Sequence, residues 1–346
     1  MHINDLLKMA VEAGASDLHV KVGTFPMLRV SGGLVPATQA KRLEHDEMVA
    51  MAAAVLPVAQ REKFKENHEV DLAYSVPGLG RFRCNAFQQR GTIGLIFRII
   101  PRGVATVDSL FLPPILKEIA TEERGLVLVT GPTGSGKSTT LAGMVNHCND
   151  NRPDHIITIE DPIEFVHTAQ KCLINQREVH RDTHGFNEAL RSALREDPDY
   201  ILVGEMRDIE TIRLALTAAE TGHLVFATLH TSSASKTIDR IIDVFPAAEK
   251  AMVRSMLSES LRAVISQSLL KKVGGGRIAA HEIMVGIPAI RNLIREDKVA
   301  QMYSAIQTGA TYGMQTLDQC LQDLVKRGLV TRQSALAYAK NKEIFR

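Results

Sequence analysis

The sequence predicts two domains of mixed α/β class: a smaller α+β domain over residues 1–100 and a larger α/β domain over residues 115–346. The length of 346 residues is typical of about two domains. Between residues 70 and 100, three segments alternate apolar and polar side chains, a pattern typical of antiparallel sheet. Beyond residue 115, apolar runs alternate with helical segments, which indicates a parallel, doubly wound sheet.

The smaller domain is expected to begin with a helix, because Ile3, Leu6 and Leu7 fall at helical spacing before Gly14. A Gly32-Gly33 turn then joins two short apolar runs and predicts a hairpin. The remaining elements are expected as a strand at 17–22, the hairpin near 27–35, helices within 45–66, and strands at 70–76, 81–89 and 94–100.

A linker is expected between the two domains. Residues 101–114 contain Pro101, Gly103, Pro113 and Pro114 and show no clear periodicity. Proline and glycine interrupt regular structure, so this segment is interpreted as the connection.

The larger domain is expected to place apolar strands between helices. A Gly274-Gly275-Gly276 turn separates the Leu269-Leu270 run from the apolar segment 278–285. From about residue 286 to 346 the pattern is mostly helical. The first strands are expected at 126–130, 155–159, 200–203 and 224–228, with helices after Lys137, near 186–196 and near 208–221.

Residues 131–138 read GPTGSGKS, a Gly-x-x-x-x-Gly-Lys-Ser phosphate loop that directly follows the apolar run 126–130. In such a loop the glycines let backbone N–H groups face the phosphates of ATP, Lys137 reaches the β/γ oxygens, and Ser138 ligates Mg²⁺. The alternative is a plain glycine turn, which the preceding strand and the following helical segment disfavour, because phosphate binds at helix N-termini. The predicted nucleotide-binding residues are Gly131, Pro132, Thr133, Gly134, Ser135, Gly136, Lys137, Ser138 and Thr139.

Two acidic segments follow predicted strands, where ligand sites form in α/β sheets. The first contains Glu160 and Glu164, and its alternative interpretation is a solvated loop. The second ends a predicted strand with Gly204 and Glu205, so that glycine replaces the aspartate usual in nucleotide hydrolases. Mg²⁺ is therefore expected to depend on Ser138, the phosphates and water more than on a second carboxylate, which leaves Glu205 to polarise the attacking water.

Two histidines, His223 and His230, bracket the predicted strand 224–228. A lone histidine is usually structural, but two that bracket one strand can sense a γ-phosphate, and His230 holds the strand-end position. Arginines from a neighbouring subunit often complete phosphoryl-transfer sites, although most surface arginines form ion pairs. The candidate arginines are Arg81, Arg83 and Arg98 in the first domain and Arg195, Arg207 and Arg240 in the second.

Composition narrows the classes of function. Lysine and arginine nearly balance aspartate and glutamate at a net charge of +2, aromatic residues make up 5% and tryptophan is absent, which disfavours nucleic-acid binding. No stretch of the sequence approaches the length of a transmembrane helix, and the protein is expected in the cytoplasm. The four cysteines form no Cys-x-x-Cys pair and are expected as reduced, mostly buried thiols.

Four ordered segments resemble the Walker A motif, Asp box, atypical Walker B motif and His box of secretion-type traffic ATPases: GPTGSGKST, TIEDPIEF, ILVGEMRD and TGHLVFATLHT. The early segments GASDLH and GRFRCN extend the resemblance over essentially the whole chain. The resemblance implies a PAS-like domain joined to a RecA-like motor domain, working as a homo-hexameric ring. It also implies Lys137 and Ser138 at phosphate and metal, Glu205 as the catalytic acid, Glu164 beside metal or water, His230 as reporter of nucleotide state, and Arg81 and Arg98 as inter-subunit cations.

Residues 289–296, AIRNLIRE, are similar to a segment of the type IV pilus retraction motors within this family. Periodicity alone favours an ordinary core-facing helix with Ile290, Leu293 and Ile294 as its apolar stripe. The chain also shows neither the extra N-terminal domain nor the paired Cys-x-x-Cys motif usual in assembly ATPases. The resemblance therefore implies a motor that retracts pili through an inner-membrane platform protein and acts on the pilin filament indirectly.

Three alternatives stay open at this point. A pilus assembly or type II secretion ATPase belongs to the same family. A RecA-like nucleic-acid translocase would share the phosphate loop and ring, but should show a basic groove or stacking aromatics. A small-molecule kinase would transfer phosphate to an acceptor and stay monomeric.

Overall fold

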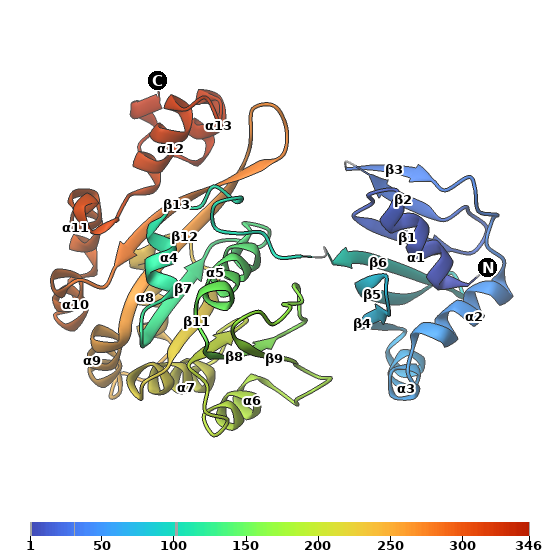
Figure 1. The fold of residues 1–346 in the computed structure, drawn as a ribbon, viewed down its shortest axis with the longest axis horizontal. Helices are drawn as coiled ribbons and strands as arrows, with labels where there is room; N and C mark the ends of the chain where they lie inside the picture. The colour runs from blue at the N-terminus through green and yellow to red at the C-terminus, as the bar shows by residue number, and fades with distance from the viewer. Residues whose placement is uncertain (1, 31, 101–102, 346) are drawn as a thin grey trace. The chain divides into compact units, whose positions relative to one another are not determined.

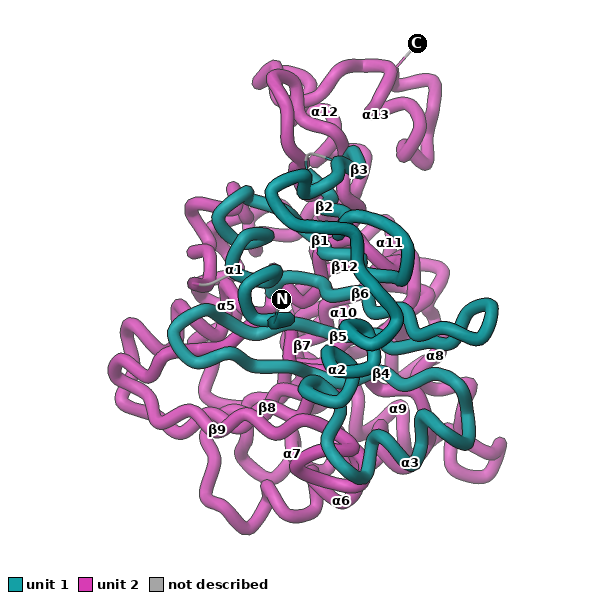
Figure 2. The backbone as a smooth tube through the Cα atoms, turned by 90° about the vertical axis from the view of Figure 1, so that its right-hand side faces the viewer, with its two compact units in different colours: residues 1–102 teal, residues 103–346 magenta. Residues whose placement is uncertain are grey.

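The computed structural model describes residues 2–30, 32–100 and 103–345. The chain forms two compact units, residues 1–102 and 103–346, each with its own sheet and its own core (Figures 1 and 2). Among the described helices, none combines the length and the apolar character needed to cross a lipid bilayer. The mixed α/β class expected from the sequence is confirmed.

The first unit is built on an antiparallel sheet with strand order β3-β2-β1-β6-β5-β4. Two residues join β5 to β6, Arg90 and Gly91, and their φ of 49° and 72° are left-handed values that suit a two-residue hairpin. The elements of this unit are α1 (Ile3–Glu12), β1 (Asp17–Lys21), β2 (Met27–Val30), β3 (Gly33–Pro36), α2 (His45–Val55), α3 (Val58–Asn67), β4 (Glu69–Val76), β5 (Gly80–Gln89) and β6 (Thr92–Ile100).

Local sequence explains how α1 begins and which side it buries. The His2 ring accepts a hydrogen bond from the Asn4 N–H, while the Asp5 carboxylate accepts one from the His2 N–H, which forms a capping box. The apolar side chains Ile3, Leu6, Leu7 and Ala10 are at most 1% exposed and belong to the core of the unit. The helix and the three long strands predicted for this domain are confirmed, with strand bounds within two residues.

The second unit contains a mostly parallel sheet with strand order β13-β12-β7-β11-β10-β8-β9. The strands from β12 to β9 pair in parallel, and β13 alone among the described strands of this sheet pairs antiparallel. The elements up to this hairpin are α4 (Ile115–Ala120), β7 (Gly125–Thr130), α5 (Lys137–Asn151), β8 (His155–Glu160), β9 (Leu173–Glu178), α6 (Phe186–Ala193), β10 (Tyr200–Val203), α7 (Ile209–Glu220), β11 (Leu224–Leu229), α8 (Ala234–Asp243), α9 (Lys250–Ser260), β12 (Leu261–Lys271) and β13 (Arg277–Val285).

Helices cover both faces of this sheet (Figure 1). Because successive strand residues point to opposite faces, Val127 and Val129 of β7 pack with α4 and α5, whereas Leu126 and Leu128 pack with the core of α6 to α9. The doubly wound arrangement predicted from the alternation of apolar runs and helical segments is confirmed. The carboxyl ends of β7, β8, β10 and β11 consequently meet at one edge of the sheet.

Short helices follow β13 to the end of the described chain. Ile290 and Ile294 of α10 are fully buried, as their predicted apolar stripe requires. Glu282 of β13, 2% exposed, links distant segments, because its carboxylate accepts the Ala234 N–H at the start of α8 at 2.8 Å and pairs with Lys340 Nζ at 2.6 Å. The elements are α10 (Pro288–Arg295), η1 (Val299–Gln301), α11 (Met302–Thr308), η2 (Ala310–Tyr312), α12 (Leu317–Lys326), α13 (Arg332–Tyr338) and η3 (Lys342–Phe345).

Two details differ from the sequence expectation. The predicted linker 101–114 is too long, because residues 103–114 belong to the second unit, where Val107 and Leu112 are buried in the core under α4 and α5. Pro101, part of that prediction, lies outside the described residues. The edge strand β9 was not predicted, since its sequence LINQRE is mostly polar and lacks an apolar run.

Candidate nucleotide-binding site

The phosphate loop lies between the last residue of β7 and the first residue of α5. Gly131, Gly134 and Gly136 have φ of 144°, 80° and 89°, values that side-chain-bearing residues rarely adopt. The loop thus turns its chain sharply into the N-terminus of α5, where unpaired N–H groups attract anions. The Oγ atom of Ser135 is buried and has no hydrogen-bond partner within the described part of the chain, as expected of a hydroxyl that faces a phosphate position.

Lys137 is the cation of this loop. Its Nζ donates to the carbonyl oxygens of Gly131 at 2.9 Å and Pro132 at 3.1 Å, and lies 3.4 Å from Nδ1 of His230. Burial lowers the pKa of Lys137, and the carboxylates of Glu205 and Glu164 act in the opposite direction. The structure therefore brings three of the predicted catalytic residues, Glu164, Glu205 and His230, within reach of the fourth, Lys137.

His230 bridges the cation and the predicted catalytic carboxylate. Its Nε2 lies 3.1 Å from Oε1 of Glu205, on the side of the ring opposite Lys137. An ammonium group only donates and an ionised carboxylate only accepts, so Nδ1 accepts from Lys137 and Nε2 carries the proton that Glu205 receives. In this arrangement the His230 ring connects the Lys137 ammonium group to the Glu205 carboxylate.

Glu205 is held as an anion. Burial raises its pKa, but the hydrogen bond and charge of Arg207, at 2.7 Å, together with His230, outweigh burial and lower the pKa below its usual value. Arg207 was one of the six candidate arginines, and the structure places it in the same chain as the acid that it contacts. A carboxylate held in this way can orient and polarise a water molecule.

Glu160 and Glu164 of the first acidic segment lie in different surroundings. Glu160 at the end of β8 is half-buried and accepts from Thr158 at 2.6 Å and Gln176 at 3.2 Å. Desolvation raises its pKa, and these two hydrogen bonds oppose the rise. Glu160 thus fixes the strand end. Glu164 is exposed on the loop that follows, with its charge acting on Lys137.

The predicted Mg²⁺ residues are Ser138, Glu164 and Glu205. Over residues 2–30, 32–100 and 103–345, no group of three His, Cys, Asp or Glu side chains gathers at metal-binding distance. Mg²⁺ usually keeps several waters and binds through one or two carboxylates and the phosphate oxygens of its substrate. The buried loop lysine, the unpartnered Ser135 hydroxyl and the left-handed glycines fit a magnesium-bound triphosphate.

His223 does not join this site. It directly precedes Leu224, the first residue of β11, whereas His230 follows Leu229, the last. A strand of 6 residues spans about 20 Å, and the Nδ1 atom of His223 hydrogen-bonds with the carbonyl of Ala218 at 3.0 Å. Within one chain the two histidines therefore lie at opposite ends of the same strand, and a role of His223 in sensing phosphate stays a prediction.

The arginines of the first domain lie in the first unit. Arg98 Nε pairs with the buried Asp17 at 3.0 Å, and Arg83 Nε lies 3.9 Å from Asp71. Both pairs are within the unit. The assignment of Arg81 and Arg98 as cations delivered to a neighbouring subunit stays a prediction.

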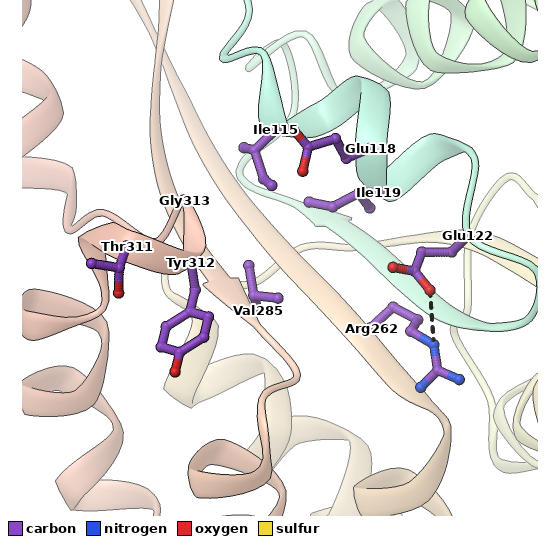
Figure 3. Close-up of a pocket in the computed structure, with 9 residues that line it drawn as sticks. All are labelled: Ile115, Glu118, Ile119, Glu122, Arg262, Val285, Thr311, Tyr312 and Gly313. Carbon is purple, nitrogen blue, oxygen red and sulfur yellow. Dashed lines mark ion pairs between the residues drawn. The ribbon is translucent and has the colours of Figure 1, made fainter.

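A cavity of about 460 Å³ lies elsewhere in the second unit (Figure 3). Arg262, near the start of β12, pairs there with Glu122 at 3.5 Å. Glu122 precedes β7, so this cavity lies at the amino edge of the parallel strands, opposite the phosphate loop. The other lining residues are Ile115, Glu118, Ile119, Val285, Thr311, Tyr312 and Gly313.

The model of the type II/IV secretion system protein family matches residues 112–335. The chain belongs to this family. The resemblance expected from the four ordered segments is thereby confirmed, and the match covers every residue of the candidate site in the second unit.

Individual relatives extend the similarity over the whole chain. The protein is 63% identical over 345 residues to a "type IV pilus retractation ATPase PilT" of Pseudomonas aeruginosa, with 100% of both chains covered. It is 57% identical to a "twitching motility protein" of Neisseria gonorrhoeae, covering 92% of this chain and 85% of that protein. Among solved structures, the pilus retraction motor PilT with bound ADP superposes with a TM-score of 0.93 at 47% identity, covering 99% of this chain and 98% of that one.

More distant family members carry secretion names. The ATPase DotB of Legionella pneumophila superposes with a TM-score of 0.80 at 29% identity, covering 97% of this chain and 94% of that chain. A type II secretion system protein E of Klebsiella pneumoniae is 34% identical over 78% of this chain, and the match covers 54% of that protein. Sequence identity is thus higher for the pilus relatives, at 47% to 63%, than for these secretion relatives, at 29% and 34%.

One residue that contacts the phosphate loop was not predicted from the sequence. Gln267 of β12 contacts the phosphate loop through its side-chain amide. It lies far from the four motifs in the sequence, and a glutamine inside a strand carries no pattern that points to phosphate. Only the pairing of β12 with β7 reveals it.

Proposed function

We propose that this protein is the ATP-hydrolysing motor that powers retraction of type IV pili. The observation that carries the proposal is full-length similarity at 63% identity to a pilus retraction ATPase, joined to a phosphate loop whose lysine is linked through His230 to an anionic glutamate. In this reaction the γ-phosphate of ATP is transferred to water, so no binding site for another phosphate acceptor is needed. Glu205 is the group that can polarise the water.

Binding of ATP exchanges the partners of Lys137. In the loop as described, its ammonium group is satisfied by two backbone carbonyls. Nucleotide phosphates offer a stronger, charged acceptor, so Lys137 turns from these carbonyls to the β- and γ-phosphates. The N–H groups at the start of α5 and the Ser138 hydroxyl approach the same phosphates.

Hydrolysis then depends on positioning and charge. Ser138 would hold Mg²⁺, which would supply positive charge to neutralise the phosphates. Glu205 orients the attacking water, and Arg207 keeps this carboxylate anionic. His230 lies between Lys137 and Glu205, so its hydrogen bonds change when Lys137 moves to phosphate and change again when the γ-phosphate leaves.

The motor is proposed to work as a homo-hexamer in the cytoplasm, bound at the inner-membrane pilus platform and acting on the pilin filament through it. In this arrangement Arg81 and Arg98 of one subunit are the candidates to approach the nucleotide of the next. Force follows from ATP-driven displacement of one unit of the chain relative to the other.

Two experiments test the proposal. Lys137→Ala in purified protein should abolish phosphate release from ATP, and retained turnover would reject the assigned site. Deletion of the gene in the native cell, followed by counting surface filaments, tests direction. Loss of a retraction motor leaves abundant, immobile pili, loss of an assembly motor leaves none, and unchanged filaments would contradict a pilus function.

A further inference from the structure

The side chain of Gln267 joins the phosphate loop to the helix that follows it. Its Nε2 donates to the carbonyl oxygen of Ser135 at 2.5 Å, and its Oε1 accepts from Oγ1 of Thr140 at 2.8 Å. Gln267 and Thr140 are each 2% exposed, so both hydrogen bonds are shielded from water. One buried amide therefore connects the middle of the loop with the first turn of α5.

Strand pairing explains why Gln267 reaches this place. β12 runs parallel to β7, and Ser266 lies opposite Thr130, the last residue of β7. Gln267 is the next residue of β12 and lies against the loop that starts at Gly131. A Cβ built on Gly131 would lie 2.4 Å from the Gln267 carbonyl oxygen, and one on Gly136 would lie 3.0 Å from Gln267 Nε2. Two glycines of the loop are thus needed for the approach of β12 as well as for the turn of the backbone.

The hydrogen bond between Gln267 and the Ser135 carbonyl bears on how the loop can bind an anion. A loop binds phosphate when its N–H groups point inward and its carbonyl oxygens point away, since an inward carbonyl repels the anion. Gln267 holds the Ser135 carbonyl in a hydrogen bond on the side of β12. This bond keeps the Ser135 carbonyl from turning toward the phosphate position before any nucleotide arrives, while the Ser135 N–H donates to the Pro132 carbonyl at 3.1 Å within the same turn.

We propose that Gln267 is a positioning residue that keeps the phosphate loop in its phosphate-accepting shape; the proposal rests on the proposed function as an ATPase. A side chain that only packs in the core contributes to the stability of the unit. A positioning residue also sets the nucleotide affinity of the fully folded protein, and this difference can be measured.

The test measures ADP binding by calorimetry in purified full-length protein with Mg²⁺, alongside the melting temperature without nucleotide and the ATPase KM and kcat. Gln267→Leu removes both hydrogen bonds, Gln267→Glu keeps the acceptor for Thr140 but sets an oxygen against the Ser135 carbonyl, and Thr140→Val removes one bond. Ser268→Ala, on the next position of the same strand, is the matched control.

Gln267→Leu and Gln267→Glu are expected to weaken ADP binding about tenfold each, the effect of losing one to two buried hydrogen bonds. KM should rise by a similar factor, with kcat at saturating ATP changed less. Thr140→Val should weaken binding on its own and add nothing to Gln267→Leu, because the two side chains share one bond. Ser268→Ala should bind ADP as the wild type does.

A Gln267→Leu protein that melts earlier but binds ADP like the wild type would overturn this inference and leave the proposed function intact. Where Gln267→Leu fails to fold, Thr140→Val carries the test, since it changes a single hydroxyl; unchanged affinity in that variant would also overturn the inference. A folded wild-type protein that binds no nucleotide would overturn the proposed function together with it.

Discussion

A buried histidine in β13 should make the second unit acid-sensitive. His281 is 1% exposed, and burial lowers its pKa to about 4. Its Nε2 atom has no hydrogen-bond partner among the residues that the structure describes, so a proton added there would find no acceptor. The perturbation is His281→Leu, which removes the titrating group and keeps an apolar side chain in the same place.

The magnitude follows from the two pKa values. A histidine titrates near 6.5 in the unfolded chain, so below that pH the unfolded state takes up a proton that the folded state refuses until about pH 4. Stability is therefore present above pH 6.5 and is lost as the pH falls toward 4. At pH 5 the loss amounts to about 2 kcal/mol, because each pKa unit of difference corresponds to about 1.4 kcal/mol.

The assay is hydrogen exchange of the amides of β12 and β13, which reports the opening free energy of this unit alone, measured at pH 7 and pH 5. Between the two pH values the wild type should lose about 2 kcal/mol more than His281→Leu. His167, whose pKa burial also lowers to about 4, is present in both proteins and cancels in the comparison. Equal losses in the two proteins would refute the reasoning.

Three further changes test the site and its supports. Glu205→Gln should lower the rate of phosphate release by a factor of about 100 or more while ADP still binds, measured by phosphate release and calorimetry; undiminished hydrolysis would remove Glu205 from its role. Gly131→Ala should lower the melting temperature and nucleotide affinity more than Gly134→Ala, since a Cβ at 131 meets Gln267 O at 2.4 Å and one at 134 meets no described atom within 4 Å; the reverse order of melting temperatures would contradict the packing argument. Lys340→Met should destabilise the second unit by about 2 kcal/mol in urea titrations, because the buried carboxylate of Glu282 loses its cation. Adding Glu282→Gln should recover part of that loss. An unchanged free energy of unfolding in Lys340→Met would show that the ion pair does not stabilise the unit.

Local patterns were sufficient to predict the phosphate loop and its surroundings. The spacing of GPTGSGKS after an apolar strand predicted where Lys137 lies, and His230 could be chosen because it follows a strand at the carboxyl edge of the sheet. The same geometry separates His223 from the phosphate loop of its own chain. This histidine flanks the same strand, but six residues of extended chain carry it to the opposite edge.

Other features depend on contacts between distant parts of the sequence. Val107 and Leu112 lie in an aperiodic, proline-flanked segment, and only burial under α4 and α5 shows that this segment belongs to the second unit. Gln267 acquires its neighbours through the register of β12 against β7, which no motif encodes. Arg207 and Glu205 are two residues apart, so their ion pair is local. The sequence nevertheless offered six candidate arginines and did not show which of them lies beside an acid of the site.

The contact of Glu282 with both Ala234 and Lys340 has a practical consequence for work on this protein. Lys340 lies beyond α13, and the helix that Ala234 begins follows directly on the loop that carries His230. Modifying the Lys340 amine would leave the buried Glu282 carboxylate without its cation beside the start of α8. Amine-reactive labels are therefore a poor choice for this protein, and a label attached to a cysteine introduced at an exposed position would leave this ion pair intact.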